Sequence, residues 1–125
     1  MRNNGGGLVS SSVEIAQQIV KKGKIIDVKF RDTKYNVTYE SKLDKPEFDF
    51  AVLVNEHTAS ASEILASAIQ DSKGGTLIGT KTFGKAVIQN TYPLSKGSVF
   101  KLTTGQYVTR NGNCLLYTLT LPTNS

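Results

Sequence analysis

Two short segments of this sequence carry residue types that could perform acyl transfer. Ser60 stands in the segment 58–64 (TASASEI), and Lys85 follows the turn segment 82–84 (TFG), 25 positions after the serine. A serine hydroxyl becomes a nucleophile when a nearby base takes its proton, and an uncharged lysine amine is such a base. The two residues are therefore a candidate Ser-Lys dyad.

Ser60 also has a purely structural interpretation. The pattern Ser60-Ala61-Ser62-Glu63 matches a capping box, in which the serine caps a helix and the glutamate three residues later bonds back to it. The two roles are compatible, because a helix start lies at the positive end of the helix dipole. Backbone N–H groups there stabilise a developing oxyanion, and the N–H of Ala61 is a natural donor.

A lysine beside a glycine turn is ordinarily a solvated charge, and it acts as a base only when burial away from carboxylates favours its neutral form. Its neighbours Phe83 and 86–88 (AVI) are apolar. Gln89 lies four residues on and, in a strand, faces the same side as Lys85, where its amide could orient the amine. His57 is a competing base, but its place three residues before Ser60 gives awkward geometry and favours an ordinary loop histidine.

Periodicity predicts a mixed α/β fold in which a layered sheet is flanked by helices. We expect a helix over 9–22, capped by one of the serines at 10–12 and stopped by Gly23. A second helix is expected over 61–71, and a polar connector over 42–48. The expected strands are 24–30, 33–40, 50–54 (a continuous apolar run, as in a strand covered on both faces), 76–79, 87–92 and 99–108, the last two joined by the turn 95–98.

Composition narrows the function classes. The 125 residues fit one domain, and the formal charge of +5 is scattered without a basic, aromatic-interleaved stripe, which argues against nucleic acid as a partner. One cysteine (Cys114) and one histidine exclude a disulfide framework and make a metal site improbable. No stretch reaches the length of a transmembrane segment. We expect no metal and no organic cofactor.

These segments, in their order and spacing, resemble the carboxyl-terminal processing, or tail-specific, serine peptidases. The segment 2–8 (RNNGGGL) is similar to that family's glycine loop, which contributes a backbone N–H to the oxyanion hole. The resemblance implies that Ser60 is the nucleophile, Lys85 the general base and Gln89 the residue that positions Lys85. It further implies oxyanion donors at Ala61 and Gly6, and a core like that of ClpP and the crotonases.

The resemblance reaches from Arg2 to about Gly112, and the segment 113–122 does not follow the family pattern. A PDZ domain and the N-terminal region of the family are absent, so we expect residues 1–125 to be a single truncated catalytic core. We expect residues 1–7 to be mobile or rearranged, and the fragment to be weakly active or inactive.

The implied function is a serine endopeptidase that cleaves proteins near their C-termini, in an extracytoplasmic compartment of a bacterium. Its partners are protein or peptide C-terminal tails, and homo-oligomer formation stays open. Two other interpretations remain: a non-catalytic binding or assembly domain that keeps the peptidase fold, and an acyl-CoA-processing enzyme of the crotonase type.

Overall fold

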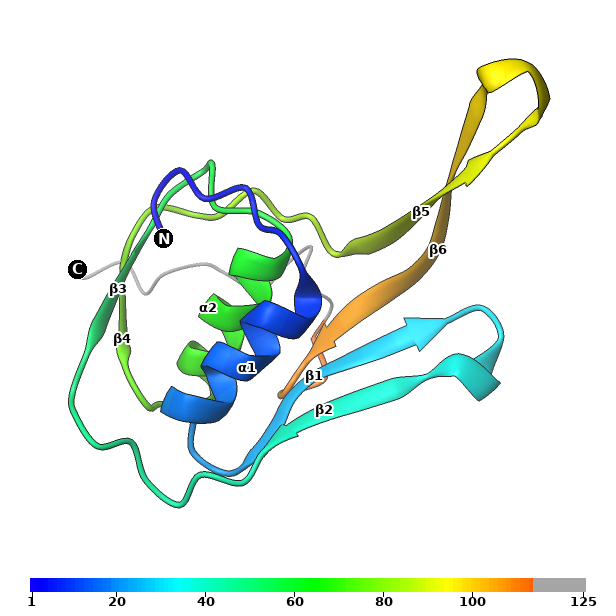
Figure 1. Ribbon diagram of the computed structural model, residues 1–125. Helices are drawn as coiled ribbons and strands as arrows, with labels where there is room; N and C mark the ends of the chain where they lie inside the picture. Colours follow the sequence, from blue (N-terminus) through cyan, green and yellow to red (C-terminus); the bar gives the residue numbers. More distant parts are fainter. Residues whose placement is uncertain (114–125) are drawn as a thin grey trace.

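The computed structural model describes residues 1–113, which form two helices and two separate sheets (Figure 1). Sheet A is antiparallel with strand order β2-β1-β6-β5, and sheet B is a parallel pair of β3 and β4. The elements are α1 (Val9–Ile19), β1 (Gly23–Phe30), β2 (Val37–Ser41), β3 (Ala51–Val54), α2 (Ala61–Ser72), β4 (Thr76–Gly79), β5 (Val87–Pro93) and β6 (Val99–Thr109), with short 3₁₀ turns at Thr33–Tyr35 and Ser95–Gly97.

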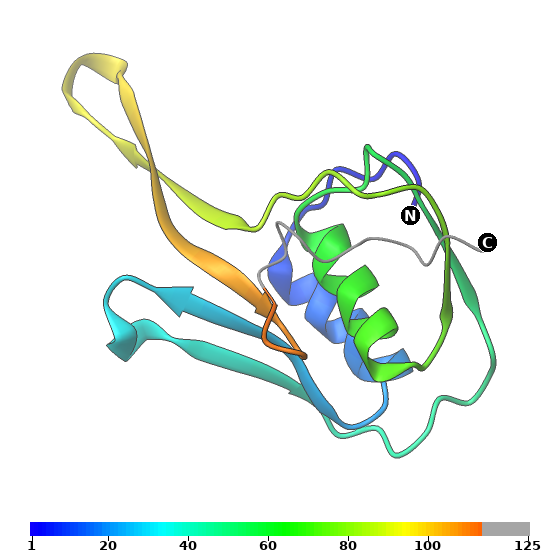
Figure 2. The same cartoon turned by 180° about the vertical axis from the view of Figure 1, so that it is seen from behind.

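The two helices lie between the two sheets, as both views of the ribbon show (Figures 1 and 2). Helix α2 contacts α1, β1, β4 and β6, so it is the central element of the core. Every residue from Ala61 to Ile69 is buried, which is more than the single apolar stripe that the periodicity indicated. The arrangement confirms a mixed α/β fold with layered sheets. The buried apolar side chains of the core are Val13, Ala16, Val20, Ile25, Ile26, Val28, Val54, Ile64, Leu65, Ala66, Ala68, Ile69, Ala86 and Tyr107.

Helix α1 is shorter than the sequence predicted, and its start is not capped by a serine. Its N-cap residue is Leu8, which makes no side-chain cap bond. Ser12, which we considered as a cap, instead donates its hydroxyl to the carbonyl of Val9 at 2.9 Å. The helix ends at Ile19, and Gly23 is the first residue of β1 with a φ of +126°. The glycine therefore serves the entry into a strand rather than the end of the helix.

The expected strand over 33–40 divides into a 3₁₀ turn and β2. The carboxylate of Asp32 accepts a hydrogen bond from the N–H of Lys34 at 3.3 Å, and this closes the turn before the chain extends. Local hydrogen bonding by an aspartate side chain competes with strand formation, and here the first three residues of the expected strand form a 3₁₀ turn instead.

Strand β3 does not have both faces covered within the described part of the chain. Leu53 is 49% exposed, and Ile78 on the paired strand β4 is 50% exposed. The apolar run correctly indicated a strand, but one face of sheet B is open among residues 1–113. Cys114 lies outside the described residues.

Strands β5 and β6 form a long hairpin that projects from the body of the molecule (Figure 2). Strand β1 pairs with β6 only over residues 105–109, so the outer part of the hairpin is a two-stranded ribbon. Its base lies beside the start of α2, because the N–H of Lys85, just before β5, bonds the carboxylate of Glu63 on α2 at 2.8 Å.

Candidate active site

The residue before helix α2, Ser60, has an unusual backbone conformation. Its φ is +57° and its ψ is −121°, in a region that residues with a Cβ rarely occupy. Such strain is of the order of 1–3 kcal/mol and occurs where the surrounding structure enforces it, often at functional sites. A sharp strand-to-helix turn of this kind exposes the hydroxyl of a nucleophilic serine at the helix start. The structure therefore places Ser60 where the sequence pattern indicated.

The side chain of Glu63 holds this turn to the loop that carries the lysine. It is fully buried, and its Oε2 accepts hydrogen bonds from the N–H groups of Ser60 at 2.9 Å and Lys85 at 2.8 Å. Its Oε1 accepts from the hydroxyl of Thr82 and the N–H of Gly84, both at 2.6 Å. The carboxylate thus joins both parts of the candidate dyad through four hydrogen bonds.

Sequence reasoning found only the first of these bonds. The capping box correctly predicted that Glu63 would bond back to Ser60. It gave no sign that the same carboxylate would bond the segment 82–85, which is about 20 residues away in sequence. The carboxylate of Glu63 thus lies against the backbone of Lys85, and its oxygens are already occupied by four donors.

Ser60, Lys85 and Gln89 line one pocket of about 330 Å³, together with Gly7 from the glycine loop. Lys85 and Ser60 are half-buried and Gln89 is exposed. Among the described residues, Nζ of Lys85 forms no ion pair and no hydrogen bond to the hydroxyl of Ser60. Catalytic hydrogen bonds often shorten only when substrate is bound, so the shared pocket is the relevant geometry. The roles of the three residues stay predictions.

Two further polar side chains, both from strand β6, line this pocket. Lys101 of β6 adds a second cation to the lining, and Tyr107 adds a phenol from the same strand. Burial raises the pKa of Tyr107 above its usual 10.0, with a smaller contribution from Tyr39. Tyr107 therefore keeps its proton and offers a neutral donor beside the lysines.

The glycine loop packs directly against the Ser60 turn. Gly6 has a φ of +98°, and a Cβ added there would lie 2.7 Å from the carbonyl oxygen of Ala59 and 2.9 Å from the nitrogen of Ala61. This contact explains a glycine at position 6, because any side chain would push the loop away. The N–H of Gly6 donates to Oδ1 of Asn4 at 3.0 Å, whereas Gly7 lines the Ser60 pocket.

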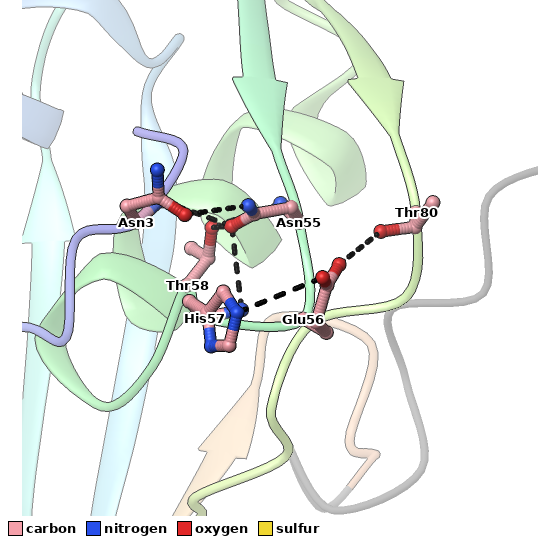
Figure 3. Close-up of polar contacts among 6 residues, drawn as sticks. All are labelled: Asn3, Asn55, Glu56, His57, Thr58 and Thr80. Atoms are coloured by element: carbon pink, nitrogen blue, oxygen red, sulfur yellow. Dashed lines mark hydrogen bonds and ion pairs between the residues drawn. The ribbon is translucent and has the colours of Figure 1, made fainter.

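The N-terminal residues make polar contacts with Asn55, Thr58 and Ala59, and the mobility that we expected of residues 1–7 stays a prediction. The side chains of Asn3 and Asn55 are joined, since Nδ2 of Asn55 donates to Oδ1 of Asn3 at 2.8 Å (Figure 3). Oδ1 of Asn55 also accepts from the N–H of Asn3 at 2.9 Å. The hydroxyl of Thr58 donates to the carbonyl of Met1, and the N–H of Ala59 bonds the carbonyl of Asn4 at 3.0 Å. No pattern in the sequence indicated the pairing of the two asparagines.

His57 lies on the outside of the same loop (Figure 3). Its side chain is 68% exposed, and its Nε2 is 3.7 Å from a carboxylate oxygen of Glu56. The pKa of Glu56 is lowered, first by its own backbone N–H and then by the hydroxyl of Thr80 at 3.0 Å. These contacts and this exposure are typical of an ordinary loop histidine.

Across residues 1–113 there is no cluster of His, Cys, Asp or Glu that could hold a metal ion.

Comparison with known proteins identifies the family. The family model described as peptidase family S41 matches residues 1–120 of the chain. The chain belongs to peptidase family S41. The match continues beyond Gly112, where the motifs alone did not allow us to align the tail.

Relatives of known type agree with this assignment. The carboxyl-terminal-processing protease of Synechocystis sp. is 42% identical over 112 residues, which are 87% of this chain and 26% of that protein. The probable CtpA-like serine protease of Staphylococcus aureus is 37% identical over 116 residues, which are 90% of this chain and 23% of that protein. The chain therefore spans about a quarter of the length of these relatives.

The solved structure of the photosystem II D1 C-terminal processing protease has the same fold. It superposes with a TM-score of 0.79 at 38% identity, over 91% of this chain and 30% of that one. Mature CPAF shares the fold with a TM-score of 0.68 at only 14% identity. The family of serine-type processing peptidases, and the α/β core that the resemblance implied, are both confirmed.

Proposed function

We propose that this chain is the catalytic core of a serine endopeptidase that cleaves proteins near their C-termini through a dyad of Ser60 and Lys85. The observation that carries the proposal is the shared pocket of Ser60, Lys85 and Gln89, with the serine on a strained turn at a helix start. Membership of a family of processing peptidases supports protein chains as substrates.

The reaction begins when Nζ of Lys85 takes the proton from the hydroxyl of Ser60. The oxygen of Ser60 attacks the scissile carbonyl carbon, and the carbonyl oxygen becomes an oxyanion. Lys85, now an ammonium, gives this proton to the leaving amine, and a C–N bond breaks to leave an acyl-enzyme. Water then attacks the acyl carbon with the help of the same amine and restores the serine.

The oxyanion needs fixed donors near the start of α2. Ala61 is the first residue of the helix, where N–H groups have no partner within the helix. The second donor comes from the glycine loop, and Gly6 would have to release Asn4 to supply it. Gly7 already lines the pocket and is the alternative donor of the same loop. Each such donor contributes on the order of 10²–10³ to the rate.

Gln89 acts through the lysine rather than on substrate. Gln89 lies on strand β5 and lines the wall of the pocket, four residues after Lys85. A neutral amide orients an amine without attracting a proton to it, as a carboxylate would. We therefore assign it the task of positioning Lys85, by analogy with the residue that orients a histidine base.

An active-site label tests the proposal. A fluorophosphonate reacts with a serine oxygen only where a base and oxyanion donors activate it, so we expect Ser60 to be labelled and Ser60→Ala not to be. Ser62→Ala is the matched control, since Ser62 lies two residues away on the same helix and outside the Ser60 pocket. Lys85→Arg should also abolish labelling, because a guanidinium keeps its proton. Labelling that persists in Lys85→Arg would assign the base elsewhere.

We propose an extracytoplasmic location for this activity, based on the family resemblance alone. None of the helices in residues 1–113 has the length and apolar character needed to cross a membrane. Fractionation of cells that express the natural chain, followed by detection with an antibody, tests the location. Recovery only with cytoplasmic markers would contradict it.

A further inference from the structure

The two hairpins of sheet A diverge and leave a cleft between them. Strand β1 pairs with β6 only over residues 105–109, and beyond this point the β1–β2 turn and the β5–β6 hairpin separate (Figures 1 and 2). The space between them is a cavity of about 580 Å³, which we call the hairpin cleft; residues within 30–35 line one side and residues within 90–104 the other. It shares no lining residue with the Ser60 pocket.

The walls of the hairpin cleft are apolar and open to solvent. Phe30 and Tyr35 line the side of the β1–β2 turn, and Tyr92 and Leu102 line the side of the β5–β6 hairpin. Tyr35 is 59% exposed, Tyr92 45% and Leu102 44%. Exposed apolar side chains that gather in one concave place are typical of a binding surface. The cleft therefore favours a ligand that brings an apolar side chain of its own.

Positive charge lies at one end of the hairpin cleft. Arg31 lines the cleft and also an adjoining cavity, which is lined by Lys29 as well. Both cations are exposed, and within residues 1–113 neither belongs to an ion pair. The carboxylate that lines the cleft, Asp32, is already paired with Lys34 at 2.9 Å. The cleft therefore also favours a ligand that carries carboxylates.

The connector between β2 and β3 carries groups that complement this cleft. Glu47, Phe48 and Asp49 are consecutive and exposed, and the side chain of Phe48 is 59% exposed. In the described part of the chain, neither Glu47 nor Asp49 belongs to an ion pair. Phe48 contacts Phe50 edge-on, with the ring centroids 6.0 Å apart, and leaves the rest of its ring open. The connector thus presents an apolar side chain between two carboxylates.

One molecule cannot bring its own connector to its own cleft. In both ribbon views, the connector runs along the end of the molecule opposite to the tips of the two hairpins (Figures 1 and 2). The two complementary surfaces can therefore meet only between molecules.

We propose that the hairpin cleft of one molecule binds the connector, residues 44–50, of a second copy of this chain. Phe48 enters the apolar part of the cleft, and its two neighbouring carboxylates lie beside Arg31 and Lys29. The contact joins two different surfaces, so the copies associate head to tail. It leaves the Ser60 pocket open, because the two cavities share no lining residue. The inference does not depend on the proposed peptidase function.

Charge favours this occupant over two others that the chain offers. If two clefts packed against each other, Arg31 and Lys29 of both copies would come together, and like charges repel. The segment 114–125 contains no aspartate or glutamate, so it lacks the side-chain carboxylates that the cleft favours. The connector supplies both carboxylates and the apolar side chain.

Self-association of the natural 125-residue chain tests the proposal, measured by sedimentation velocity from micromolar to millimolar concentration. Interfaces that bury less than about 1,200 Å² are commonly weak and transient. We therefore expect the average mass to rise above the 13.6 kDa of one chain as the concentration increases. Salt should reduce the association, because it screens the ion pairs between exposed groups. A chain that stays at 13.6 kDa throughout would overturn the proposal.

Two variants test the two surfaces separately. Phe48→Ala removes the apolar side chain of the connector, and Arg31→Glu reverses a charge in the cleft. We expect each to weaken self-association at least tenfold, with an unchanged circular dichroism spectrum because both residues are exposed. Leu53→Ala is the matched control, since Leu53 is 49% exposed on sheet B and lies in neither surface. Association that persists in either variant, or that Leu53→Ala weakens equally, would refute the assignment.

A mixture of the two variants tests the head-to-tail contact. Phe48→Ala keeps the natural cleft and Arg31→Glu keeps the natural connector, so each variant retains one working surface. An equimolar mixture should form pairs as tightly as the natural chain associates, and it should stop at two chains. A mixture that associates no better than either variant alone would contradict the contact.

A peptide distinguishes a second copy from another protein as the occupant. The probe is a fluorescent heptapeptide with the sequence of residues 44–50 (DKPEFDF) and blocked ends. We expect fluorescence anisotropy to show that it binds the natural chain and binds Arg31→Glu at least tenfold more weakly. Absence of binding would overturn the proposal. Binding to a chain that stays monomeric at every concentration would assign the cleft to an acidic segment of another protein and refute the second copy.

Discussion

Replacement of Glu63 by glutamine tests whether one buried carboxylate joins the serine turn to the lysine loop. The side chain is fully buried and accepts four hydrogen bonds, two at each oxygen. Glutamine has the same shape, but one of its terminal atoms is an NH₂ group, which donates and does not accept. In either amide orientation, two of the four donors face another donor.

The expected loss of stability follows from these bonds. A hydrogen bond to a charged group contributes about 1.5–3 kcal/mol, so loss of two bonds lowers the free energy of unfolding by about 3–6 kcal/mol. That is a large part of the roughly 5–15 kcal/mol by which a domain of this size is stable. The melting temperature should fall by more than about 10 °C.

Urea and thermal unfolding followed by circular dichroism measure this change, with Glu14→Gln as the matched control. Glu14 is exposed on α1, and its replacement should alter stability by no more than about 0.5 kcal/mol. Because Glu63 bonds the backbone of both Ser60 and Lys85, the folded fraction of Glu63→Gln should also label more slowly with a fluorophosphonate. A Glu63→Gln variant as stable as Glu14→Gln would refute the role of the carboxylate.

Two other variants test the glycine loop and an acid-sensitive contact. Gly6→Ala should displace the glycine loop and slow the labelling of Ser60 at least tenfold, because the new Cβ would meet backbone atoms at 2.7–2.9 Å. Gly5→Ala is the control. Its new Cβ meets nothing within 4 Å, so this variant should be labelled like the natural chain. Burial of Asp27 raises its pKa, but hydrogen bonds from Lys24 and Thr38 and nearby positive charge outweigh burial and bring its pKa below 3.8. A lowered folded-state pKa stabilises the fold above the unfolded-state pKa, and this stability is lost as pH falls through the folded value. Asp27→Asn should therefore be less stable than the natural chain at pH 7, and urea unfolding should show the difference shrinking below about pH 3.8; a constant difference down to pH 2 would contradict the assignment.

Local signals predicted those parts of the fold that are decided within a few residues of the chain. Helix α2 begins at Ala61 and β4 spans Thr76–Gly79, as capping and apolar patterning indicated. The predicted start of α1 at residue 9 is confirmed, but the predicted serine cap was wrong, because the N-cap residue is Leu8 and no side chain caps the helix. The predicted end of α1 at residue 22 was also wrong, since the helix ends at Ile19.

The parts of the site that depend on distant residues were not predictable from pattern. The pairing of Asn3 with Asn55 joins positions 52 residues apart, and neither asparagine belongs to a motif that indicates a partner. The bonds from Glu63 to the segment 82–85 are similar, since a capping glutamate ordinarily uses only its own helix. Family resemblance supplied the candidate residues, but only coordinates supply the contacts that hold them.

The structural and catalytic interpretations of Ser60 are two consequences of the same local geometry. The glutamate half of the capping box is present, because the carboxylate of Glu63 accepts from the N–H of Ser60 and leaves the serine hydroxyl out of that bond. The second oxygen of that carboxylate fixes Thr82 and Gly84, so the segment before Lys85 cannot shift without breaking bonds to helix α2. In a free peptide helix the capping glutamate would be exposed to solvent; here it is fully buried and bonds a second loop. The capping motif alone indicates only the start of a helix. When its glutamate is buried and also bonds a distant loop that carries a lysine, the motif indicates a candidate active site.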